Sequence, residues 1–163
     1  MKKLMFFLIC LIIAGCEYAV PLPNAPNIDI DRSVLGLWQT TKDDGQTEDL
    51  LVLPLGEQKY MISFPSGTKN SMFALACLWR DKGMTLVQLN WFGTAQAELP
   101  KNNRTYQFAS YSVEGDEMRI RMLNKDVVNE NIGSSEELAK AVLDNRTNPL
   151  LFRDEMLFKK ISK

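Results

Sequence analysis

TYQFASYSVEGDEMRIRML, residues 105–123, is the stretch that decides the fold class, because it encodes a β-hairpin. In 117–123, Met and Ile alternate with Arg, which is the period of a strand with one buried face and one solvated face. The preceding run, 105–113, is also strand-like, and Glu114-Gly115-Asp116 between the two runs tolerates the positive φ of a tight turn. Two antiparallel neighbours are therefore expected here.

Similar short apolar or alternating runs recur on both sides of this hairpin. Asp43-Asp44-Gly45 and Asp81-Lys82-Gly83 supply further hairpin turns. The expected strands are 34–41, 48–54, 58–64, 71–80, 84–91, 105–113, 117–123 and 156–162. The 71–80 run is more uniformly apolar than the others, which is compatible with a strand covered on both faces. The pattern predicts a mostly β domain over 32–163, an antiparallel up-and-down β-barrel of about eight strands; another β-sandwich or a half-open barrel are the alternatives.

One segment departs from the β pattern. Ser134 and Glu137 form a capping box, and apolar residues follow at helical spacing until Asn145. We expect one short amphipathic helix before the last strand, packed against the barrel.

The N-terminus has the features of a secretory leader. Lys2 and Lys3 precede an uncharged apolar run over 4–13. As a helix this run rises only about 15 Å, roughly half of the hydrocarbon core, which suits a cleaved signal peptide better than a permanent span. A signal peptide is therefore predicted over 1–15.

The end of this leader, Ile13-Ala14-Gly15-Cys16, resembles the lipobox of bacterial lipoproteins. The resemblance implies cleavage before Cys16 and acylation of that cysteine, with several acyl chains giving a stable anchor. The partner would be a membrane of the cell envelope. In a Gram-negative cell, Glu17 at the following position favours the periplasmic side of the outer membrane. Residues 16–31, with three prolines, are interpreted as a tether that reaches up to about 40 Å.

Gly36-Leu37-Trp38, at the start of the first expected strand, resembles the glycine-any-tryptophan motif of the lipocalin, or calycin, superfamily. The resemblance implies that Trp38 closes the base of the barrel. It also implies that a basic residue of the last strand, Lys159 or Lys160, lies over the indole by a cation–π contact. The segment 29–33 allows a lid-like turn before Trp38.

Composition excludes most kinds of chemistry. The chain has no histidine, which removes Ser-His and Cys-His nucleophiles, histidine metal sites and the usual general base. Cys77 lies in an apolar run and is interpreted as a core residue. Cleavage would remove Lys2 and Lys3 and shift the formal charge from −1 to −3, without a basic stripe for nucleic acid. We expect a protein without enzymatic activity, cofactor or metal.

Aromatic residues are the remaining site candidates. Trp79, Trp91 and Phe92 are candidates for lining a ligand cavity, although core packing would explain each tryptophan. Large residues at 72, 86, 108, 118 and 122 would fill the interior if they all pointed inward, because an eight-stranded barrel holds either side chains or one small ligand. The leading hypothesis is an envelope lipoprotein that binds a small apolar or lipid-like molecule. The alternative is an envelope interaction, inhibitor or immunity-type protein that acts through its loops.

Overall fold

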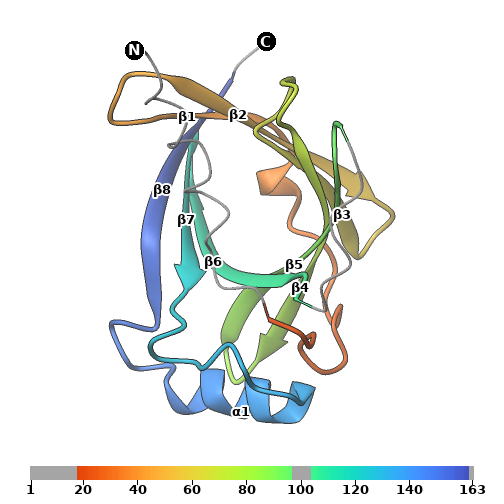
Figure 1. The fold of residues 1–163 in the computed structure, drawn as a ribbon, viewed down its shortest axis with the longest axis vertical. Coiled ribbons are helices and arrows are strands. Elements are labelled where there is room, and N and C mark those ends of the chain that lie inside the picture. Colours follow the sequence, from red (N-terminus) through yellow and green to blue (C-terminus); the bar gives the residue numbers. More distant parts are fainter. Residues whose placement is uncertain (1–17, 97–103, 162–163) are drawn as a thin grey trace, which may run out of the picture.

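The structure, a computed structural model, describes residues 18–96 and 104–161. In this part of the chain, eight antiparallel strands each pair with the next in sequence, and the last pairs with the first, so the sheet closes into a barrel (Figure 1). The elements are η1 (Arg32–Val34), β1 (Gly36–Thr41), β2 (Thr47–Leu55), β3 (Lys59–Phe64), β4 (Met72–Asp81), β5 (Met84–Thr94), β6 (Tyr106–Glu114), β7 (Glu117–Leu123), α1 (Ser135–Asp144) and β8 (Phe152–Lys160). The predicted barrel with one short helix before its last strand is confirmed.

The start of β8 is where the sequence prediction deviates most from the structure. The strand begins at Phe152, four residues before the expected 156. Polar residues at 153–155 conceal this start in the hydropathy pattern. The register between β7 and β8 shifts after Ile120, and Asp154 has a φ of 56°. Such an irregular, polar strand end lacks the alternation on which the prediction depends.

Alternate residues of the strands face into the barrel and form the inner core. Trp38 lies opposite Leu50, and Met118 lies opposite Phe158, so neighbouring strands place large apolar side chains at matching heights. The buried members of the inner core are Val34, Trp38, Leu50, Val52, Tyr60, Ile62, Ala74, Ala76, Leu78, Met118 and Phe158. Burial of these side chains is the main stabilising contribution of the barrel interior.

Residues 28–35 cover one end of the barrel, which we call the plugged end. Asp31 caps the 3₁₀ turn η1, and the Ile30 N–H donates to the Glu57 carbonyl in the turn after β2 (2.9 Å). Val34 enters the inner core. The turns after β2, β4 and β6 lie at this end; the connections after β1, β3, β5 and β7 lie at the other, which we call the loop end.

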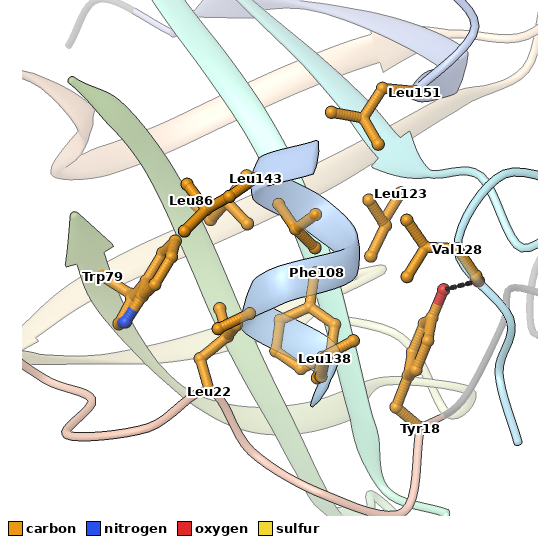
Figure 2. Close-up of a cluster of buried hydrophobic side chains, with 12 residues drawn as sticks. Tyr18, Leu22, Trp79, Leu86, Phe108, Leu123, Val128, Leu138, Leu143 and Leu151 are labelled. Carbon is orange, nitrogen blue, oxygen red and sulfur yellow. Dashed lines mark hydrogen bonds between the residues drawn. The ribbon is translucent and has the colours of Figure 1, made fainter. Parts of the chain in front are cut away.

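A second cluster, the outer core, lies outside the barrel wall. Helix α1 packs there with the first described residues of the chain (Figure 2). The members are Tyr18, Leu22, Trp79, Leu86, Phe108, Leu123, Val128, Leu138, Ala139, Val142, Leu143 and Leu151. Strand β4 is therefore apolar on both faces, as expected for the 71–80 run. The predicted cap is also confirmed, because the Ser134 hydroxyl accepts from the Glu137 N–H (3.2 Å) and Asn145 caps the helix end.

Residues 18–31 differ from the extended tether that the prolines suggest. Tyr18 and Leu22 are almost completely buried in the outer core. Tyr18 exchanges two backbone hydrogen bonds with Tyr106, its N–H donating over 2.7 Å and its carbonyl accepting over 3.1 Å. Its hydroxyl donates to the Val128 carbonyl (2.8 Å), as Figure 2 shows. Apolar side chains between the prolines, which have no helical or strand period, make this segment part of the domain.

The predicted leader over 1–15 and Cys16 lie outside the described residues. Within 18–96 and 104–161, no helix is both long enough and apolar enough to cross a membrane.

Candidate functional site

The inner surface of strands β5 to β8 is the candidate site. Five of its inward-facing side chains are only partly buried, whereas Met118 and Phe158 on the same strands are buried. The residues in question are Leu89, Trp91, Tyr111, Ile120 and Met156. Accessible apolar surface that faces inward is what a small apolar ligand requires.

Trp91 adds a polar contact to this apolar surface. Its indole Nε1 donates to the Gln107 side-chain oxygen over 2.8 Å. Gln107 lies opposite Leu89 in the register and is only 6% exposed. Because buried amides need hydrogen-bond partners, this contact allows a glutamine to line the barrel wall.

Asp31 binds the covering segment, residues 28–35, which we call the plug, to two strands of the barrel wall. Its carboxylate accepts from the Tyr111 hydroxyl (3.0 Å) and from the Ser33 N–H (2.9 Å), and its own N–H donates to the Tyr60 hydroxyl (2.6 Å). Tyr60 belongs to β3 and Tyr111 to β6. The plug is therefore held by side chains from both sides of the barrel.

These contacts shift the acidities of the groups involved. Burial alone raises the pKa of Asp31, but the hydrogen bonds from Ser33 and Tyr111 outweigh it, so that the pKa lies below its ordinary value. Burial raises the pKa of Tyr60 to about 12, and the Asp31 charge adds to the increase. Burial and the Asp31 charge also raise the pKa of Tyr111. The ionised Asp31 carboxylate therefore lies beside two neutral phenols of the barrel wall.

The Trp38 contact expected from the lipocalin resemblance is made by Lys160. The Lys160 Nζ lies 5.1 Å from the Trp38 ring centroid, and the indole Nε1 donates to the Val34 carbonyl (2.8 Å). Gly36 has a φ of +119°, and a Cβ there would meet the Lys160 side chain at 3.5 Å. Lys159 instead lies on the outside, 4.0 Å from Glu117. The lysine and tryptophan together close the base of the inner core.

Trp79 and Phe92 do not line the interior, which corrects their interpretation as ligand-lining candidates. Trp79 lies in the outer core and donates to the Pro23 carbonyl (3.1 Å). Phe92 is 49% exposed and stacks on Phe73, at a bulge between β4 and β5. Leu86 and Phe108 also belong to the outer core, whereas Met118 faces inward. Because β4 to β6 carry apolar residues on both faces, periodicity does not show which face points inward.

Sequence reasoning did not identify Asp31, Tyr60, Tyr111 or Gln107 as site residues. The sequence allows a turn over 29–33, and the structure places the 3₁₀ turn η1 at Arg32–Val34, overlapping the end of that segment. Its partners were not, because Tyr111 lies 80 positions from Asp31 and no local pattern links them. The only available signal was the presence of polar residues at inward positions of apolar strands.

A shallow groove of about 310 Å³ lies on the outer face of β2, β3 and β4, bordered by the loop 66–71. Leu51, Leu53, Met61 and Phe73 provide most of its apolar lining. Leu53 and Met61 are 39% and 38% exposed. Clustered exposed apolar residues of this kind often mark interaction surfaces.

Cys77 is buried on the outer side of β4, and burial raises the pKa of its thiol. A raised pKa disfavours the thiolate, the reactive form. In the part of the chain that the structure describes, no three His, Cys, Asp or Glu side chains gather as metal ligands. Glu48, in the acidic β1–β2 hairpin, pairs with Lys42.

Comparisons of the chain with protein-family models, with curated proteins and with solved structures gave no match.

Proposed function

We propose that the protein is an acylated protein of the bacterial cell envelope that binds a small apolar or lipid-like molecule inside its barrel and catalyses no reaction on it. The observation that carries this proposal is the partly exposed, inward-facing apolar surface of β5 to β8. An eight-stranded barrel has room for one small ligand where its lining residues leave space. The plug, held by Asp31, supports a site with one covered end.

The absence of histidine supports binding rather than catalysis. Two pairs of polar groups on the inner surface bind each other, Trp91 with Gln107 and Asp31 with Tyr111. Such pairs orient the wall and the plug, whereas a general acid or base would need a carboxyl or imidazole with a pKa near the working pH.

The test uses residues 17–163, expressed and purified without the leader. The purified protein is extracted with organic solvent to recover bound lipid and is examined by native mass spectrometry. It is then titrated with a fluorescent fatty acid. We expect a co-purified lipid or saturable binding. Ile120→Trp, which adds bulk to the inner surface opposite Met156, should abolish binding. Leu75→Trp adds the same bulk on the outer face, opposite Met61, and should leave binding unchanged. Thermal unfolding checks that both variants fold. Leu89→Trp is a second inward-facing variant and should also abolish binding.

An absence of lipid and of fatty-acid binding in the folded protein would contradict the proposal. That result would favour the alternative, an envelope protein that binds a protein partner. The specific observation in its favour is the groove lined by Leu51, Leu53, Met61 and Phe73. Met61→Asp would then reduce partner capture, and Ile120→Trp would not.

A further inference from the structure

The position of Tyr18 determines where the N-terminal chain leaves the domain. Its backbone pairs with Tyr106 in both directions, its hydroxyl donates to Val128, and its ring meets Phe108 at 5.2 Å between centroids. The side chain has no exposed surface. Three kinds of contact therefore hold the exit point against the barrel wall.

The proposed acylation site lies very close to this exit point. Only Glu17 stands between Cys16 and Tyr18. Consecutive Cα atoms are about 3.8 Å apart, so the Cα atoms of residues 16 and 18 are at most about 7.6 Å apart. An acyl chain on Cys16 lies in the bilayer, and Tyr18 must then lie within about one nanometre of the membrane surface.

Tyr18 lies at the loop end of the barrel. Tyr106 is the first residue of β6, and Val128 lies in the connection between β7 and α1. Both positions belong to the loop end as defined above, whereas η1 and the turns after β2, β4 and β6 mark the opposite end. We infer that the domain stands directly on the membrane with its loop end toward the bilayer and its plugged end away from it.

The exposure of Leu150 agrees with this orientation. Leu150, 66% exposed, lies just before β8 at the loop end, where its carbonyl accepts from Asn124. A strand of nine residues spans about 30 Å and is tilted in a barrel, so the plugged-end turns would lie about 20 Å farther from the bilayer.

The inference rests on the proposed acylation of Cys16 and adds an orientation to the proposed binding function. With the loop end at the bilayer, an apolar ligand would enter the barrel from the membrane without crossing bulk water. The partner of this surface is a lipid bilayer. The short stretch of chain between Cys16 and the buried Tyr18 fixes the orientation of the domain on it.

The experiment uses the full chain, expressed with its leader and purified from membranes after metabolic labelling with a fatty acid. A fluorophore is attached to Lys125→Cys, at the loop end, or to Glu57→Cys, at the plugged end; both positions are exposed, and Cys77 is buried. Each labelled protein is reconstituted in phosphatidylcholine vesicles that contain a lipid with a nitroxide on its headgroup. We expect severalfold stronger quenching at position 125 than at position 57.

A matched variant carries a flexible insert of ten Gly and Ser residues between Glu17 and Tyr18. Because the insert frees the domain from the surface, quenching at position 125 should fall toward the level at position 57. Equal or reversed quenching in the acylated protein without the insert would overturn the orientation and leave the proposed function standing. Absence of fatty-acid label, with the Cys16→Ala variant still in the membrane fraction, would overturn both.

Discussion

The contacts of Asp31 with Tyr60 and Tyr111 make the stability of the folded protein depend on pH. The pKa of Tyr60 is raised to about 12, so the folded protein binds the phenolic proton more tightly than the unfolded chain does. The stabilisation is complete below pH 10 and is lost as the pH rises toward about 12. For Asp31, whose pKa is lowered, the stabilisation is present above its ordinary value of 3.8 and is lost on acidification.

Tyr60→Phe tests this account. The variant keeps the ring in the inner core but removes the hydroxyl that binds the Asp31 backbone. We expect the free energy of unfolding at neutral pH to fall by about 1 kcal/mol. Its decline from pH 10 upward should also become shallower, with Tyr111 accounting for the remainder. Urea unfolding at several pH values measures both effects, and an unchanged alkaline slope would contradict the assignment.

Gly36 and Trp38 show how far single residues could be predicted. The glycine-any-tryptophan motif predicts the position of Trp38 and, by resemblance, two candidate lysines, Lys159 and Lys160. A φ of +119° explains why glycine stands at 36, because L side chains rarely adopt it. The choice between Lys159 and Lys160 depended on the β1–β8 register, in which Trp38 lies opposite Lys160. That register is a long-range property that the sequence pattern does not contain.

Strands and the helix were predictable because each carries its own local signal: alternation, turn residues or a cap. The N-terminal segment was not, since residues 18–31 have neither period nor cap and contain Pro21, Pro23 and Pro26. Its order comes from contacts with Phe108 on β6 and with Val128, far along the chain. Segments stabilised only by distant partners are read as loops in a local analysis.

Tyr18→Ala tests whether this segment is part of the domain. The substitution removes a fully buried ring and its hydrogen bond to Val128. We expect a loss of about 3–5 kcal/mol, the usual cost of truncating a buried aromatic residue to alanine. Thermal or urea unfolding of residues 17–163 gives the value. Val20→Ala, at a partly buried position of the same segment, is the control and should cost much less. Equal stability of Tyr18→Ala and the parent would favour a loose tether.

The whole molecule contains two cores that share one wall. Strands β4 to β6 present Ala76 and Leu78 to the inner core and Trp79, Leu86 and Phe108 to the outer core. The barrel itself was predictable from the number of strands and their hairpin turns. The division of this wall between two cores was not predictable. An apolar run indicates that both faces of a strand are covered, but it does not indicate which residues cover each face.

A shared wall predicts a single cooperative unfolding transition. Trp38 reports on the inner core and Trp79 on the outer core. Two variants each keep only one of these tryptophans and have the others replaced by Phe. In each variant, the urea-unfolding curve followed by fluorescence should have the same midpoint and slope as the curve followed by circular dichroism. An outer-core fluorescence transition at clearly lower urea than the circular dichroism of the same variant would show that α1 and the N-terminal segment separate from an intact barrel.

The hydrogen bond from Tyr18 to Val128 also orders events in time, since it joins residues 110 positions apart. Residues 18–31 have no docking surface until β6, the β7–α1 connection and α1 exist, so their attachment depends on nearly the whole chain having been synthesised. Contacts of such large sequence separation form late and slow the folding of β proteins. The processing proposed at Cys16 would therefore act beside a segment that docks late in folding. We expect the docking of Tyr18 to be among the last steps in the folding of this chain.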